Sequence, residues 1–134
     1  MNPDEKFLCP CESGLPFKQC CEPYLQGDRY PATAVALMRS RYTAFVKLAP
    51  DYLRQSWHPD TCPAEIELEH DIIWKGLQIV SHHKGKQLHK QGTVEFKAFY
   101  RKAEREGVLH EVSRFVRYHK RWVYLDGEFP TIEH

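Results

Sequence analysis

The residues best suited to chemistry in this chain are four cysteines near the N-terminus, Cys9, Cys11, Cys20 and Cys21. A Ser-Gly-Leu-Pro turn at residues 13–16 separates the two pairs and would fold one back on the other. Four thiolates could then reach one tetrahedral ion at ~2.3 Å each. The spacing therefore predicts a structural Zn²⁺ site.

Two other uses of paired cysteines fit less well. Disulfides belong to oxidising compartments, and the chain begins with polar residues rather than a basic and apolar signal segment, so we expect a cytoplasmic protein. A redox dithiol is typically Cys-x-x-Cys at a strand-to-helix junction, a spacing that this block lacks. The fifth cysteine, Cys62, stands alone.

The block resembles the SEC-C motif, whose defining positions are matched by Cys9, Cys11, Ser13, Gly14, Phe17, Cys20 and Cys21. The resemblance implies zinc binding by Cys9, Cys11, Cys20 and Cys21. Cys20 and Cys21 are adjacent, and adjacent residues present their side chains to the same side only in a tight turn or a first helical turn. Of the four ligands, Cys21 is therefore the one whose assignment depends on this local backbone geometry. Three histidines could replace it, namely His58, His82 and His83.

The remaining motif positions have mechanical roles. Gly14 permits a positive φ in the turn, and Phe17 supplies an apolar plug. So short a segment cannot bury a core of its own, so metal binding should supply most of its folding free energy. We predict that the segment is disordered without zinc.

Composition limits the rest of the chain. The 134 residues are 42% hydrophobic with a formal net charge of +1, which fits one modest domain, residues 27–134, after a zinc segment, residues 1–26. No apolar run approaches the ~18 residues that a membrane-spanning helix needs. The 19 basic and 18 acidic residues nearly cancel, which argues against nucleic acid as a partner. The basic patches at 84–86 and 117–121 lie in expected hairpin turns.

Periodicity predicts helices first and strands second. Thr33 should cap a helix from Ala34 to about Leu48, with Arg41 on its apolar face and with Arg39, Thr43 and Lys47 opposite. Arg39 and Ser40 are expected at the surface. Further helices are predicted at 50–57 and at 63–73, the latter with Ile66, His70 and Ile73 inward. Strands are predicted at 77–80, 92–100, 110–118 and 121–125, joined as hairpins. The pattern is α+β, with about three helices on one concave face of a curved antiparallel sheet.

A second resemblance covers nearly the whole chain. Residues 37–45, 51–53, 57–59, 74–77, 113–115 and 121–127 are similar to blocks of the YchJ family. That family is similar to a SEC-C motif joined to a nuclear-transport-factor-2-like cone, a fold that usually encloses a pocket. Some members carry a second SEC-C copy at the C-terminus, whereas this sequence shows a single copy, at residues 9–21. Cones of this fold often pair through the open sheet face, which allows a homodimer.

An arginine on a core-facing helix position needs a partner, because burying an unpaired charge costs several kcal/mol. Asp126 and Glu111 are the candidate partners of Arg41. The arrangement is either an internal ion pair or the floor of an anion-binding pocket. On the third strand we expect Phe115 inward and Arg114 outward. The predicted pocket residues are Arg41, Tyr42, Trp74, Glu111, Tyr124 and Asp126.

These features support three functional hypotheses. The SEC-C motif of the bacterial preprotein translocase ATPase binds a chaperone, so the resemblance favours an adaptor that binds a protein partner. The alternatives are a small-molecule-binding or catalytic pocket in the cone, and weak nucleic-acid binding. His58, His70 and Tyr42 could transfer protons, but no nucleophile-and-base pair stands at a telling spacing, which favours a non-enzymatic role.

Overall fold

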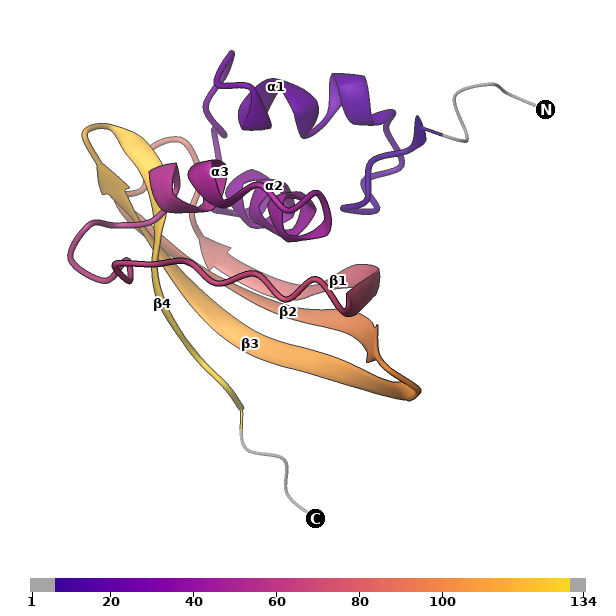
Figure 1. Ribbon diagram of the computed structural model, residues 1–134. Helices are drawn as coiled ribbons and strands as arrows, with labels where there is room; N and C mark the ends of the chain where they lie inside the picture. The colour runs from indigo at the N-terminus through magenta and orange to yellow at the C-terminus, as the bar shows by residue number, and fades with distance from the viewer. Residues whose placement is uncertain (1–6, 131–134) are drawn as a thin grey trace.

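The protein is a layer of helices over one face of a curved antiparallel sheet, with the cysteine segment packed over the helices (Figure 1). The computed structural model describes residues 7–130. The helical elements are η2 (Phe17–Gln19), α1 (Glu22–Leu25), α2 (Ala34–Val46) and α3 (Pro50–Gln55). The strands are β1 (Ile72–Lys84), β2 (Gln91–Lys102), β3 (Arg105–Tyr118) and β4 (Arg121–Glu128). The predicted α+β architecture is confirmed.

The four strands form a meander in the order β1-β2-β3-β4, so the predicted hairpins are present and longer than expected. Extra residues in β1, at Lys75 and Val80, and in β4, at Leu125, bend the strands, as bulges do. Alternation along β2 turns Val94, Phe96 and Ala98 into the core. On β3 Phe115 is buried and Arg114 exposed, as predicted.

Helix α2 is the central element of the helical layer. Thr33 caps it as predicted, because its Oγ1 accepts a hydrogen bond from the Ala36 amide at 3.1 Å. Leu37 and Met38 are buried against the sheet side of the core. Within residues 7–130 no helix combines the length and the apolar character needed to cross a bilayer.

The predicted helix at 63–73 is wrong. The guanidinium of Arg54 donates hydrogen bonds to the carbonyl oxygens of Pro63 and Ala64, with N–O distances of 3.3 and 2.8 Å. These bonds hold the segment in an extended path. Ile73 then pairs with Arg101 inside β1 and is half exposed. Ile66 does pack inward, against the small cluster around Leu53, whereas His70 is exposed.

Part of the polar side of α2 is also buried, contrary to prediction, whereas Lys47 is exposed. Thr43 and Ser40 are fully buried, and Ser40 shares a hydrogen bond of 2.7 Å with the Tyr52 hydroxyl. The reason is that the cysteine segment and α3 cover the sides of α2 that the sheet leaves open (Figure 1). Helical periodicity identified the face towards the sheet and could not show this second layer.

Candidate functional site

The cysteine segment brings four sulfur atoms to one point. The Sγ atoms of Cys9, Cys11, Cys20 and Cys21 all lie within 4.8 Å of one another. Cys20 Sγ is 3.5 Å from that of Cys11 and 3.9 Å from that of Cys21. Sulfurs bound tetrahedrally to zinc at ~2.3 Å are about 3.8 Å apart. The four cysteines therefore fit a single tetrahedral metal ion.

The backbone of the segment explains this convergence. Leu8 bridges Pro16, and the Cys9 amide donates to the Leu15 carbonyl at 2.9 Å, which closes a small loop. Gly14 has a φ of 87°, the positive value that the motif requires. The short helix η2 then turns the chain, and Cys21 lies at the start of α1. The adjacent cysteines thus occupy the first-turn geometry that lets both face one ion.

The sulfur cluster is largely shielded from solvent. Cys9, Cys11 and Cys21 are buried, and Cys20 is half-buried. Hydrogen bonds with the thiols of Cys11 and Cys21 hold the pKa of Cys9 well below its usual range, whereas burial raises the pKa of Cys20 to about 11. Four sulfur donors with no open position are typical of structural rather than catalytic metal sites.

Polar groups on other elements contact the cluster. The Thr43 hydroxyl on α2 donates to Cys21 Sγ at 3.3 Å and lies 3.6 Å from Cys9 Sγ. Ser13 Oγ lies 3.1 Å from Cys20 Sγ, which gives the motif serine a physical role. Arg39 Nη1 donates to the Cys11 carbonyl at 2.5 Å. The sequence pattern did not indicate these contacts of Thr43 and Arg39. The spacing of Arg39, Thr43 and Lys47 along one side of α2 was the available signal.

Glu12 fastens the cysteine segment to the sheet. Its Oε2 accepts a hydrogen bond from the Leu77 amide at 2.7 Å, two residues after the irregular pairing at Lys75 in β1. A Cβ on residue 76 would lie 2.8 Å from that oxygen, so Gly76 leaves the space that the carboxylate occupies.

We expect Glu12→Ala to reduce the free energy of unfolding by about 1.5–3 kcal/mol, the value of a hydrogen bond to a charged group. The loss should appear as a lower midpoint in urea. Glu104→Ala, in the exposed β2–β3 turn, is the matched control and should change stability by at most about 0.5 kcal/mol. Equal effects of the two variants would contradict the role of Glu12.

The alternative histidine ligands lie elsewhere. Within residues 7–130 the only group of metal-binding side chains is the set of four cysteines. His58 Nδ1 accepts a hydrogen bond from the Asp60 amide at 3.0 Å, and its ring packs against Tyr118. His82 and His83 are exposed in β1.

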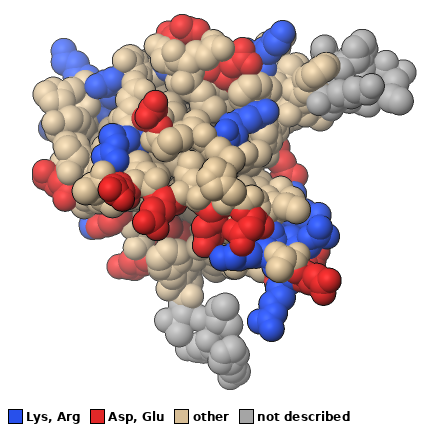
Figure 2. Space-filling model, in the orientation of Figure 1, with Lys and Arg blue, Asp and Glu red and all other residues tan. Residues whose placement is uncertain are grey.

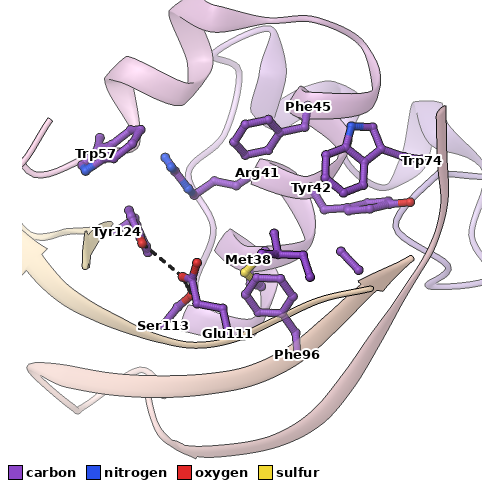
Figure 3. A pocket seen from close by; sticks show the side chains of 12 residues that line it. Met38, Arg41, Tyr42, Phe45, Trp57, Trp74, Phe96, Glu111, Ser113 and Tyr124 are labelled. Atoms are coloured by element: carbon purple, nitrogen blue, oxygen red, sulfur yellow. Dashed lines mark hydrogen bonds between the residues drawn. The ribbon is translucent and has the colours of Figure 1, made fainter. Parts of the chain in front are cut away.

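A separate cavity of about 200 Å³ lies between α2 and the concave face of the sheet (Figure 3). Its walls are mostly aromatic and aliphatic, with a few polar groups. The lining residues are Met38, Arg41, Tyr42, Phe45, Trp57, Trp74, Phe96, Ala98, Leu109, Glu111, Ser113 and Tyr124. Five of the six predicted pocket residues therefore meet here, and Asp126 does not.

Arg41 has partners that the sequence did not indicate. Its Nη1 donates to the Leu53 carbonyl at 2.9 Å and to Ser56 Oγ at 2.7 Å. The guanidinium also lies over the rings of Trp57 and Tyr124, at 4.9 and 4.7 Å from their centroids. Burial lowers the pKa of Arg41 to about 10, so the group stays charged at neutral pH.

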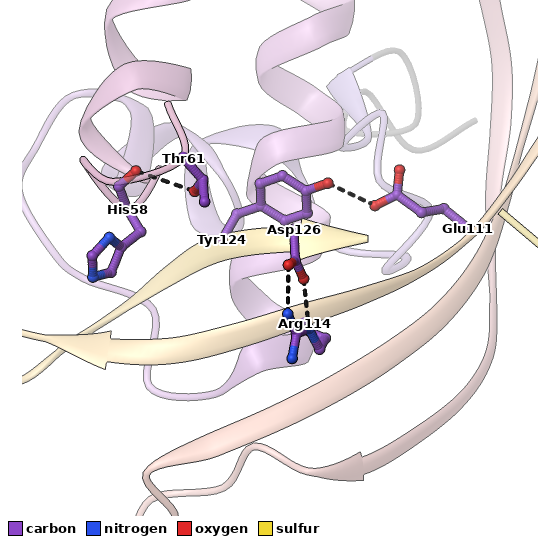
Figure 4. Close-up of polar contacts among 6 residues, drawn as sticks. All are labelled: His58, Thr61, Glu111, Arg114, Tyr124 and Asp126. Atoms are coloured by element: carbon purple, nitrogen blue, oxygen red, sulfur yellow. Dashed lines mark hydrogen bonds and ion pairs between the residues drawn. The ribbon is translucent and has the colours of Figure 1, made fainter. Parts of the chain in front are cut away.

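Glu111 is the buried carboxylate of the cavity. Its Oε2 accepts a hydrogen bond from the Ser113 hydroxyl. It accepts a second one, at 3.1 Å, from the Tyr124 hydroxyl (Figure 4). Burial, together with the neighbouring Glu111 carboxylate, raises the pKa of Tyr124, which keeps this hydroxyl protonated as a donor.

The predicted pairing of Asp126 with Arg41 is wrong. Asp126 forms a two-pronged ion pair with Arg114, with Arg114 Nε at 2.6 Å from Oδ1 (Figure 4). Both side chains are about half exposed, at 58% for Arg114 and 44% for Asp126. Asp126 lies opposite Arg114 in the β3–β4 ladder, so strand pairing brings these two together on the outer side of the sheet.

Charge on the surface is mixed. Figure 2 shows acidic and basic side chains interspersed on the face in view, without a broad area of one sign. In the 117–121 patch, Arg117 donates to the carbonyls of Gln87 and His89, at 2.7 and 3.2 Å, and so holds the β1–β2 loop. That cation therefore has a structural role.

Comparison with known proteins identifies relatives over nearly the whole chain. The family model described as YchJ, middle NTF2-like domain, matches residues 33–127, and the SEC-C motif matches residues 8–23. UPF0225 protein plu2503 of Photorhabdus laumondii is 44% identical over 131 residues, covering 92% of this chain and 81% of that protein. UPF0225 protein SCO1677 of Streptomyces coelicolor is 46% identical over 121 residues, covering 90% and 94%.

Solved structures agree with these matches. The solution structure of RPA3114, a SEC-C motif containing protein from Rhodopseudomonas palustris, has a TM-score of 0.77 at 30% identity and covers 92% of this chain and 98% of that one. A SEC-C motif containing protein from Psychrobacter arcticus gives 0.71 at 28% identity, covering 94% and 84%. The chain belongs to the UPF0225 family, the proteins with a SEC-C motif and a YchJ-type NTF2-like domain.

Proposed function

We propose that this protein binds one structural zinc ion through Cys9, Cys11, Cys20 and Cys21. The convergence of the four sulfur atoms within 4.8 Å carries the proposal. Zinc is the metal that favours tetrahedral, all-thiolate, closed sites. Such a site needs reduced thiols, which supports a cytoplasmic location.

Metal content tests this proposal. Protein purified without added metal should contain one zinc per chain, and Cys21→Ser should lose it, because no described histidine lies within reach as a replacement. Cys62→Ser is the matched control and should retain zinc, since Cys62 lies outside the cluster. Full zinc occupancy in Cys21→Ser would contradict the proposed ligand set.

We also propose that the outer surface of the cysteine segment binds a protein partner, so that the molecule acts as an adaptor. Three apolar side chains there are exposed, namely Phe7 at 65%, Leu8 at 46% and Leu15 at 49%. Leu8 and Leu15 flank the small loop that the Leu8–Pro16 bridge and the hydrogen bond from Cys9 to Leu15 close. Because this loop carries two of the four cysteines, zinc would hold it in place. Exposed apolar groups on a rigid element are typical of interaction surfaces.

Site-specific cross-linking in cells tests the adaptor role. A photoreactive amino acid at position 15 should give one discrete protein adduct, because that position lies in the proposed interface. The same group at position 108 is the control, because Val108 is similarly exposed, at 51%, but lies in β3, outside the cysteine segment. Identical adducts at both positions, or none at position 15, would contradict the proposal.

A further inference from the structure

We propose that the cavity beneath α2 binds a small, planar, uncharged molecule with an aromatic ring and an adjacent hydrogen-bond acceptor and donor, as in an aromatic primary amide. The acceptor would bind Arg41 and the donor would bind Glu111. This site is separate from the cysteine cluster and from the exposed surface of the cysteine segment, and the inference is argued from the side chains that line the cavity.

The size and walls of the cavity favour one ring. An apolar cavity of about 150 Å³ is large enough to hold benzene, and this cavity measures about 200 Å³. Tyr42 and Trp74 meet edge to face at 5.9 Å between centroids, and Trp57 and Tyr124 do so at 5.3 Å. These pairs form aromatic walls, which suit a flat apolar group.

The guanidinium of Arg41 is held in place, but part of its hydrogen-bonding capacity is free. Only its Nη1 has hydrogen-bond partners within residues 7–130. The rings of Trp57 and Tyr124 flank the group and fix its plane. A buried guanidinium carries several donors, so the remaining N–H groups facing the cavity can meet a ligand acceptor.

The carboxylate of Glu111 is held in the same way. The hydroxyls of Ser113 and Tyr124 both donate hydrogen bonds to its Oε2, and Oε1 has no hydrogen-bond partner in the described part of the chain. Residue 127 is a glycine across the ladder, and a Cβ there would overlap the carboxylate. The site is therefore shaped to seat Glu111 with one oxygen free to accept from a ligand.

Charge balance selects an uncharged ligand. Arg41 and Glu111 are the charged side chains of the cavity, and their opposite charges offset each other. An anion or a cation of the same shape would leave one buried charge uncompensated, which is costly in an enclosed apolar site.

Three probes of equal shape test this inference, namely benzamide, benzoate and benzamidine, titrated into the full-length zinc-loaded protein. We expect benzamide to bind at least about tenfold more tightly than either ion, a difference of ~1.4 kcal/mol. Amide chemical-shift changes should centre on residues 41, 57, 111 and 124. Equal binding of all three probes, no detectable benzamide binding, or shifts elsewhere would overturn the proposal.

Charge-altering variants sharpen the test. Glu111→Gln removes the negative charge with almost no change of shape, and should move the preference from benzamide to benzoate. Arg41→Met should move it to benzamidine. Glu106→Gln, at an exposed site on the same strand, should leave the preference for benzamide unchanged. Because Arg41 also holds α3, Glu111→Gln is the decisive variant, and an unchanged preference in it would overturn the proposal.

Discussion

Cys11→Ser should destabilise the whole domain and not only the cysteine segment. Cys11 is fully buried, and three of the four cysteines belong to the same hydrophobic cluster as Leu37, Phe96 and Phe115. Small zinc domains gain about 10–16 kcal/mol from the metal, so losing even part of that should cost about 5 kcal/mol here. Typical domains are stable by only about 5–15 kcal/mol, and the variant should be largely unfolded.

Urea denaturation followed by tryptophan fluorescence measures this effect, because Trp74 and Trp122 report on the sheet rather than on the cysteine segment. A strong chelator added to the parent protein should reproduce the loss. Cys62→Ser should change stability by no more than about 0.5 kcal/mol, since Cys62 makes only weak, exposed contacts. An unchanged midpoint in Cys11→Ser would show that the metal holds its segment alone.

Thr43→Val should weaken metal binding without unfolding the protein. The substitution keeps the side-chain shape and removes the hydroxyl that donates to Cys21 Sγ. Groups that hydrogen-bond metal ligands typically contribute about 10–100-fold to metal affinity. We therefore expect zinc affinity to fall by that factor.

Competition with a chromophoric chelator gives the affinity directly. Thr93→Val is the matched control, because Thr93 lies in β2 away from the cluster and its side chain makes no hydrogen bond among the described residues. Its zinc affinity should equal that of the parent. Equal affinities for Thr43→Val and the parent would remove α2 from the metal site.

Much of the fold, the cysteine cluster and the lining of the cavity could be predicted from local sequence signals. The cysteine spacing predicted the cluster, since the turn at 13–16 acts within a few residues. The cap at Thr33 and the four strands could be predicted from hydrophobic periodicity and from turn residues, which are also local signals. The side chains that meet in the cavity could be named because α2 and the inner face of the sheet both showed their apolar periodicity.

The predictions that are wrong concern positions where tertiary contacts determine the structure. The sequence makes Asp126 one of two candidate partners of Arg41, but the register of β3 and β4 places it beside Arg114. The segment 63–73 has a helical pattern, yet Arg54 and the pairing of β1 hold it extended. Thr43 was placed on the solvent side of α2, because a helix period cannot reveal that a second layer covers it. Each miss involves a partner distant in sequence.

The cysteine cluster and the cavity share one helix. Thr43 faces the sulfur cluster, and its neighbour Tyr42 lines the cavity and packs against Trp74. Glu12, in the cysteine segment, also holds β1 next to that tryptophan. The position of α2, and with it the shape of the cavity, therefore depends on the cysteine segment being folded.

X-ray absorption at the zinc edge, on protein purified without added metal, tests the four-cysteine site directly. A single closed site made by Cys9, Cys11, Cys20 and Cys21 predicts four sulfur neighbours at ~2.3 Å and no nitrogen or oxygen shell. A first shell of mixed sulfur and nitrogen, or no zinc in the protein, would contradict it.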